Sequence, residues 1–241
     1  MAEGKPLVVS GLSVDFGGHR ANDSVDFRAL PGLVTGLIGP NGAGKTTLFN
    51  AICGLVRPTT GTIHVGDVDI TNIKPNQRAR HGLARTFQRL EMFTLLTVRE
   101  NVAVAAKLRQ GNAGDAGVEA LLERVGLSDV ADARVDEIPT GRARLVELAR
   151  ALATNPAVLL LDEPASGQTD EETDVFGALL RDLAAEGITI VLVEHDVRLV
   201  MSVCDRIAVL DLGRLIAEGE AEEIRNNPLV LNAYLGTSGA A

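Results

Sequence analysis

Hydrophobic and polar residues alternate at the start of the chain and give way to short apolar runs further along. Apolar positions recur with a period of two between Leu7 and Phe16, and Val25 and Phe27 repeat the alternation, which predicts N-terminal strands. Further strands are predicted at Leu33–Ile38, Gly61–Val65, Val158–Leu161, Ile188–Val193 and Ile207–Leu212.

Segments with helical periodicity lie between these runs. Helices are predicted at Thr46–Cys53, in a short segment near Pro75, and in two later segments with apolar faces at Leu145, Leu148, Ala149 and Leu152 and at Val175, Leu179 and Leu183. Because strands alternate with helices, we expect an α/β fold whose main sheet is largely parallel.

The stretch from Val98 to Val125 departs from this alternation. Its pattern is helical and is interrupted by a predicted loop at Gly111–Gly117. We interpret it as an inserted lobe within one domain that spans residues 1–241. The predicted core comprises residues 1–88 and 145–236, and the predicted helical subdomain comprises about 89–144.

Composition and charge narrow the class of protein. Of the 241 residues, 46% are hydrophobic and 23% are charged, as in an average soluble globular protein. The net charge of −9 argues against a nucleic-acid-binding surface and against direct adsorption to anionic lipid. Cys53 and Cys204 carry no metal or disulfide signal. The longest apolar runs are too short to span a bilayer, so any membrane association is expected to need a partner.

A glycine-rich motif lies between a predicted strand and a predicted helix. It matches the phosphate-loop pattern GxxxxGK[ST], and its residues together with the next one are Gly39, Pro40, Asn41, Gly42, Ala43, Gly44, Lys45, Thr46 and Thr47. Glycines let backbone N–H groups converge on phosphate oxygens without a side-chain clash. Lys45 would reach the β- and γ-phosphates, and the Thr46 hydroxyl would ligate Mg²⁺.

Acidic and polar side chains follow other strands of the predicted sheet. A strand that ends in Asp162 and Glu163 would bring one carboxylate to the magnesium and the other to a water that attacks the γ-phosphate. The alternative is an acidic loop that faces solvent, which rarely accompanies an upstream phosphate loop. His195 also ends a core strand. Taken alone, His195 would more often be structural and Gln88 would be a surface residue.

Taken in order, these motifs resemble those of the ATP-binding cassette (ABC) ATPase family, from about Leu7 to Leu235. Within the family, the chain is most similar to the LivG-type ATPase subunits of branched-chain amino acid importers. The stretches that carry this similarity are Leu83–Gln88, Glu194–Val197, Cys204–Ile207 and Asn226–Gly236. The resemblance implies a phosphate-loop NTPase (RecA-like) core, an N-terminal antiparallel β subdomain and an inserted α-helical subdomain.

The resemblance also implies roles for individual residues, with ATP and Mg²⁺ as cofactors. Asp162 would support the metal together with Thr46. Gln88 would contact the metal and the attacking water and would sense a membrane subunit. Glu163 would be the general base, and His195 would stabilise the γ-phosphate. Phe16 would stack on adenine, although ordinary core packing is an equal alternative for that ring.

Partners follow from the same resemblance. Two cassettes of this family close head-to-tail, so a second ATPase subunit is expected, either an identical copy or a LivF-like sister. Two transmembrane permease subunits and, indirectly, a substrate-binding protein are expected too, which would place the chain in the cytoplasm, peripheral on the inner face of the membrane. The apolar segment Arg89–Thr97 would dock a cytoplasmic helix of the permease, with one or two of its large side chains exposed.

Two segments depart from the family pattern. The signature LSGGQ is replaced by Ile138-Pro-Thr-Gly-Arg142, in which Pro139 offers neither a hydroxyl nor an N–H. Thr140, Gly141 and Arg142 would face the partner's nucleotide. The segment Ser166–Thr169 lacks the usual aspartate. Either the site completed by this signature turns over slowly, or Thr140 and Arg142 supply substitute donors and both sites work.

The sequence alone leaves other functions open. The cargo could differ, as in urea import or lipid export, because binding proteins and permeases choose it. An ABC protein of DNA repair or translation is less consistent with an acidic chain that has one cassette and no long coiled-coil insertion. A phosphate-loop kinase would need an acceptor site in place of Glu163 beside Asp162.

Overall fold

The N-terminal part of the chain forms an antiparallel sheet. The computed structural model describes residues 3–107 and 114–236. In strand order β2-β1-β4-β5, this sheet contains β1 (Leu7–Phe16), β2 (His19–Ala29), β4 (Thr60–Val65) and β5 (Val68–Asp69). Val9, Val25 and Phe27 are buried, as the period of two predicts. The predicted antiparallel β subdomain is therefore confirmed.

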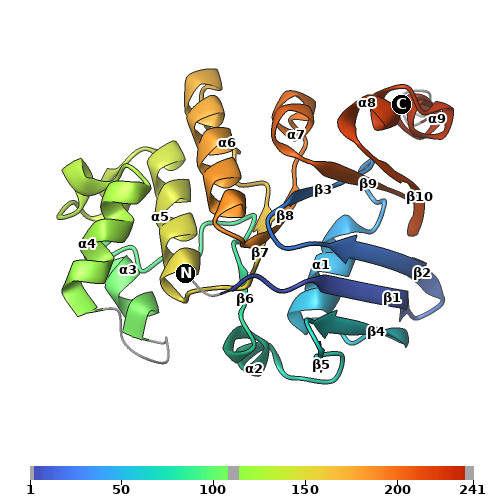
Figure 1. Cartoon of the computed structure of the whole chain (residues 1–241), viewed down its shortest axis with the longest axis horizontal. Helices are drawn as coiled ribbons and strands as arrows, with labels where there is room; N and C mark the ends of the chain where they lie inside the picture. Colours follow the sequence, from blue (N-terminus) through green and yellow to red (C-terminus); the bar gives the residue numbers. More distant parts are fainter. Residues whose placement is uncertain (1–2, 108–113, 237–241) are drawn as a thin grey trace.

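A second, larger sheet runs through the centre of the molecule (Figure 1). Its strand order is β10-β9-β3-β8-β7-β6, and every pair except β10-β9 is parallel. The strands are β3 (Val34–Ile38), β6 (Leu83–Arg85), β7 (Val158–Asp162), β8 (Thr189–Val193), β9 (Arg206–Asp211) and β10 (Arg214–Gly219). All residues of β3, β7 and β8 are buried, which is typical of parallel strands covered on both faces. The predicted α/β class is confirmed.

Alternate residues of β7 pack into two different cores. Val158 and Leu160 join the core between the two sheets, which also contains helix α1 (Lys45–Cys53). Leu159 and Leu161 join the core on the other face, beneath helices α6 (Asp170–Ala185) and α7 (Val197–Val203). Helices α2 (Pro75–Arg80), α8 (Ala221–Arg225) and α9 (Pro228–Gly236) lie at the periphery. No helix of the described ranges is both long and apolar enough to cross a membrane.

Three helices gather at one end of the molecule, on the left of Figure 1: α3 (Val98–Lys107), α4 (Gly114–Arg124) and α5 (Thr140–Ala153). Single turns at Ser128–Val130 and Val135–Glu137 connect α4 to α5. We propose that this group is the predicted helical subdomain, whose boundary near residue 144 falls inside α5.

Two local predictions need correction. Residues 111–113 of the predicted loop lie outside the described ranges, and Gly114–Gly117 belong to α4, where packing of Val118 and Leu122 outweighs the helix cost of glycine. The predicted stripe on α6 is also wrong at Val175, which is 71% exposed. The helix buries Phe176 and Leu180 instead, because the apolar face is centred one position further along.

The C-terminal end of α1 is closed by one buried guanidinium. Arg78 donates from Nη1 to the carbonyl oxygens of Ala51 (2.7 Å) and Ile52 (2.6 Å), in the last turn of α1. Its other nitrogens donate to the carbonyls of Thr71 and Ile73, both at 2.8 Å. The cation thus donates to carbonyls of the last turn, in addition to the N–H of Gly54 that Ala51 accepts, and complements the negative end of the helix dipole.

Replacing this arginine is expected to destabilise the fold strongly. In Arg78→Met, four carbonyls each lose the guanidinium as a donor, and we expect the free energy of unfolding to fall by about 3 kcal/mol. Urea unfolding at equilibrium measures the change. Arg80→Met, at an exposed position of the same helix, is the matched control and should change stability by less than about 0.5 kcal/mol. Similar changes in the free energy of unfolding for both variants would contradict this role for Arg78.

Candidate nucleotide-binding site

The phosphate loop connects β3 to α1 and is shaped by its glycines. Gly44 precedes α1 with φ 100°, and a Cβ there would lie 2.4 Å from the carbonyl oxygen of Ala21. A Cβ at Gly39 would lie 2.0 Å from the carbonyl oxygen of Leu210. Gly42, by contrast, has φ 80° and no atom within 4 Å of such a Cβ. The loop therefore packs closely against the protein on one side and leaves its other side open to an anion.

Lys45 curls back over this loop. Its Nζ donates to the carbonyl oxygens of Gly39 (2.6 Å) and Pro40 (3.0 Å), and the side chain is buried. Burial lowers the pKa of Lys45, and the negative charges of Glu163 and Asp162 act in the opposite direction. The ammonium group is therefore held by carbonyl oxygens of the loop, a position from which its hydrogen bonds can pass to phosphate oxygens.

The end of β7 carries the two acidic residues. Asp162 is the last residue of the strand and is 4% exposed. Glu163 follows with φ 50°, a conformation that is strained for a non-glycine residue, and its N–H donates to the carbonyl oxygen of Val193 (2.8 Å). The chain thus turns sharply here, so that the two adjacent carboxylates have different surroundings.

Glu163 is the meeting point of three loops. His195 Nε2, from the loop after β8, lies 2.9 Å from Glu163 Oε1. Gln88 Nε2, from the loop after β6, donates to Glu163 Oε2 at 3.1 Å. Both neighbours can orient the carboxylate, which leaves Glu163 able to accept a proton from a water near the phosphate loop.

These groups line one cavity of about 440 Å³. The lining residues are Phe16, His19, Ala21, Asn41, Gly42, Ala43, Gly44, Lys45, Thr46, Thr47, Gln88, Glu163, Val193 and His195. Phe16 is 49% exposed, so its ring is a partly open wall of the cavity and not part of the core. Gly39, Pro40 and Asp162 do not line the cavity. The predicted signature residues Thr140–Arg142, which begin α5, are not among the lining residues of this cavity either.

Sequence reasoning missed the carboxylate of Glu194, which fixes two of these loops. Glu194 is 7% exposed, and its two oxygens accept the N–H of Ala165 (2.8 Å) and of His195 (3.0 Å). Burial raises the pKa of Glu194, although the backbone donors oppose the shift. The carboxylate joins the loop after β7 to the loop after β8. No local pattern marks this role, because the contact to Ala165 spans 29 positions.

A second missed residue is Arg85, at the end of β6. Its Nη2 donates to Asp162 Oδ2 at 2.7 Å, and both side chains are less than a tenth exposed. Its Nη1 donates to Asn50 Oδ1 of α1, also at 2.7 Å. His19 and Ala21, on β2, also escaped prediction although they line the cavity.

Comparisons with known proteins agree with this geometry. The model of the ABC transporter family matches residues 22–166, and that of the branched-chain amino acid ATP-binding cassette transporter matches residues 214–240. The high-affinity branched-chain amino acid transport ATP-binding protein LivG of Escherichia coli (strain K12) is 41% identical over 95% of this chain and 97% of LivG. The corresponding protein BraF of Pseudomonas aeruginosa is 39% identical with the same coverage.

A solved structure leads to the same family. The crystal structure of the ADP conformation of an ATP-binding cassette of an ABC transporter aligns with a TM-score of 0.87 and 30% identity, over 96% of this chain and 99% of that one. The chain belongs to the ABC transporter family and is one of its ATP-binding, ATP-hydrolysing subunits.

Proposed function

We propose that this subunit drives the import of branched-chain or other hydrophobic amino acids. The observation that carries the cargo assignment is the match of residues 214–240 to the branched-chain family, beyond the catalytic motifs. The similarity to LivG and BraF along nearly their whole length supports it. Urea import and lipid export are the alternative assignments of cargo.

The side chains in the cavity suggest how hydrolysis proceeds. Glu163 takes a proton from the attacking water, and His195 and Gln88 hold its carboxylate in place. Lys45 and the amides of the phosphate loop bind the phosphates. Phe16 stacks on the adenine from the open side of the cavity.

The residues beside the phosphate loop fit Mg²⁺. In residues 3–107 and 114–236, no three His, Cys, Asp or Glu side chains gather into a metal cluster. Mg²⁺ commonly takes one or two carboxylates and completes its shell with phosphates and water, so a full protein cage is not required. We assign Thr46, Gln88 and Asp162 to this ion. Bound there, it would neutralise charge on the transferred phosphate.

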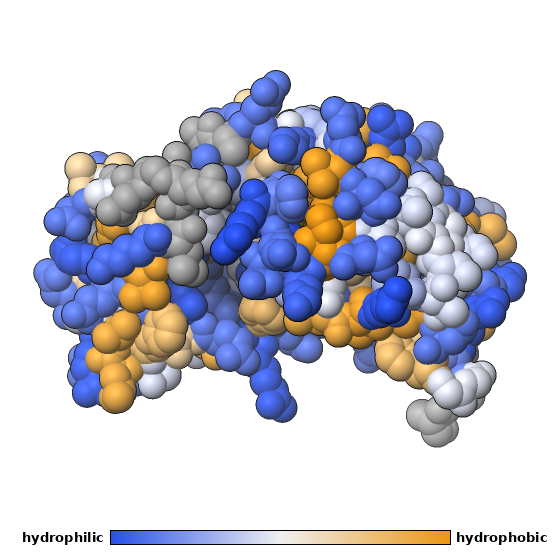
Figure 2. All heavy atoms as spheres, turned by 90° about the horizontal axis from the view of Figure 1, so that it is seen from below, coloured by the Kyte–Doolittle hydropathy of each residue, from blue (hydrophilic) through white to orange (hydrophobic). Residues whose placement is uncertain are grey.

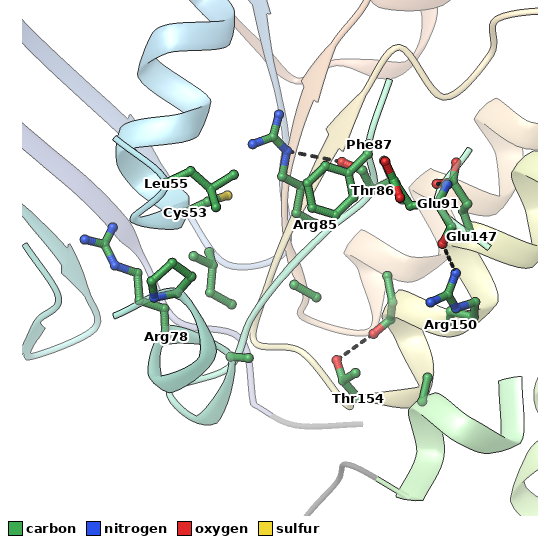
Figure 3. Close-up of a pocket in the computed structure, with 16 residues that line it drawn as sticks. Cys53, Leu55, Arg78, Arg85, Thr86, Phe87, Glu91, Glu147, Arg150 and Thr154 are labelled. Carbon is green, nitrogen blue, oxygen red and sulfur yellow. Dashed lines mark hydrogen bonds between the residues drawn. The ribbon is translucent and has the colours of Figure 1, made fainter. Parts of the chain in front are cut away.

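A second pocket fits a membrane subunit. It has a volume of about 340 Å³ and lies between α1, α2 and β6 on one side and α3 and α5 on the other. Figure 3 shows Leu55, Phe87 and Arg150 around it. Seen from below in Figure 2, the molecule is hollowed between the helical lobe and the rest. Because the described helices do not cross a membrane and the family serves transporters, we propose that a cytoplasmic helix of the permease occupies this pocket.

Exposed apolar side chains occur in the segment that contains the pocket residue Glu91. Leu90, Phe93 and Leu95 are 36%, 48% and 78% exposed, so three large side chains of Arg89–Thr97 face outward where one or two were expected. Leu55 and Phe87 extend the apolar surface into the pocket itself. We call Leu55, Phe87, Leu90, Phe93 and Leu95 the docking patch. Through it, the subunit would be held in the cytoplasm at the inner face of the membrane.

The start of α5 suggests how two cassettes share their nucleotides. Pro139 precedes the helix and gives it no side-chain cap. Arg142 is held by both oxygens of Asp129, at 2.6 Å each, so it must leave that carboxylate before it can bind a phosphate. We propose an asymmetric pair with a LivF-like sister. The site containing Lys45 and Glu163 hydrolyses ATP, and the site completed by Thr140, Gly141 and Arg142 turns over slowly.

A single substitution separates the asymmetric pair from two equal sites. Glu163→Gln removes the general base from this chain's site only. In the assembled heterodimeric transporter we expect ATP hydrolysis to fall by about 100-fold, the size of a general-base contribution. Steady-state phosphate release measures it. More than half of the wild-type activity in the variant would contradict the asymmetry.

Transport itself tests the proposed function. The chain is reconstituted into liposomes with its sister cassette, two permease subunits and the binding protein, and uptake of radiolabelled leucine, valine or urea is followed. ATP-dependent uptake of leucine and valine is expected. Uptake of urea alone, or ATP hydrolysis that no cargo stimulates, would rule out the proposed cargo.

A further inference from the structure

Arg85 lies between the docking pocket, which it lines, and Asp162 at the end of β7, with which it pairs. On one side, its guanidinium is paired with Asp162, the carboxylate that we assign to Mg²⁺. On the other side, it lines the pocket that we assign to the permease helix. No role for this side chain follows from hydrolysis alone, and the placement suggests a connection between the two sites.

The contacts hold the guanidinium between several fixed groups. Nη1 and Nη2 each donate at 2.7 Å, to Asn50 of α1 and to Asp162 of β7, and Nε donates to the carbonyl oxygen of Thr86 at 3.2 Å. The carbon between the nitrogens lies 5.0 Å from the ring centroid of Phe87. All three nitrogens and the flat face of the group are therefore engaged.

Phe87 is the part of this arrangement that an incoming helix can reach. Its side chain is 39% exposed and belongs to the docking patch, and Figure 3 shows its ring beside Arg85 at the pocket. Gln88, which holds Glu163, is the next residue in the chain. A helix that presses on the Phe87 ring would therefore press on the group that packs against the Arg85 guanidinium.

We propose that Arg85 is a positioning residue that transmits occupancy of the docking pocket to the Asp162 carboxylate. Docking moves Phe87 and with it Arg85, which changes how firmly the guanidinium holds Asp162 Oδ2, an oxygen that would serve Mg²⁺. The Mg²⁺ concentration that the cassette needs for half-maximal nucleotide binding therefore changes when the permease is present. The inference rests on the proposed docking of a permease helix.

The test compares Mg²⁺ dependence in two states of the protein. A fluorescent ATP analogue is titrated at a series of Mg²⁺ concentrations, with the isolated chain and with the assembled transporter. For the wild type, we expect assembly to shift the Mg²⁺ concentration for half-maximal binding by about fivefold or more. The ammonium of Arg85→Lys cannot engage Asn50 and Asp162 together through a planar fork. In this variant, the half-maximal Mg²⁺ concentrations of the isolated chain and of the assembled transporter should therefore agree within about twofold.

Three further variants make the result specific. Asn50→Ala removes one anchor of the guanidinium and keeps its pairing with Asp162, so an intermediate shift is expected. Leu95→Asp, in the docking patch, should reduce co-purification with the permease. Arg80→Met, at an exposed position of α2, should show the same shift in Mg²⁺ concentration on assembly as the wild type.

Each outcome bears on one of the two proposals. If Arg85→Lys assembles and shows the wild-type shift, or if the wild type shows none on assembly, the role of Arg85 is overturned and docking stands. If the wild type does not assemble with the permease, the docking proposal fails and the role of Arg85 fails with it. Thermal unfolding checks that Arg85→Lys is folded. If it is not, Asn50→Ala decides, and an unchanged shift in that variant overturns the inference.

Discussion

Parallel pairing of β3, β8, β7 and β6 is the constraint on which the site depends. Parallel strands end at the same edge of a sheet, so the segments that follow them converge. Here they bring Lys45, Gln88, Glu163 and His195 to one cavity, although 150 positions separate the first residue from the last. The N–H of Glu163 bonds to Val193 and extends the pairing one step beyond β7. If one of these strands ran in the opposite direction, the functional residue that follows it would lie at the opposite edge of the sheet.

Buried charges then hold the loops that the sheet has brought together. Glu194 joins the loops after β7 and β8 through backbone N–H groups, and Arg85 joins β6 and α1 to Asp162. Arg78 secures the far end of α1, whose first turn lies at the phosphate loop. Each of these charges is fully paired or hydrogen-bonded, as burial requires. The proposed docking pocket and the cavity at the phosphate loop share this framework, because Arg85 lines the pocket and pairs with Asp162 at the end of β7.

Sequence reasoning located strands, helices and connecting loops where the signal is local. The phosphate loop and the strand that ends in Asp162 are contiguous patterns, and strand alternation is enough to predict the mainly parallel sheet. It failed where distant residues decide the outcome. The hydrogen bond from Arg85 to Asp162 spans 77 positions, and no local sequence pattern around either residue predicts the other as its partner. On α6, the spacing of Val175, Leu179 and Leu183 matched a helix, but tertiary packing placed the buried face on Phe176 and Leu180. Exposure of Leu95 likewise depends on how its loop crosses the surface.

The most direct test of the account is a crystal structure of Glu163→Gln with ATP and Mg²⁺. The account predicts that the γ-phosphate lies beside Lys45 and residue 163. It also predicts that the ion contacts the Thr46 hydroxyl and lies on the Asp162 side of the phosphates. Nucleotide bound away from the phosphate loop, or an ion remote from both Thr46 and Asp162, would contradict the central claim that these elements form one site.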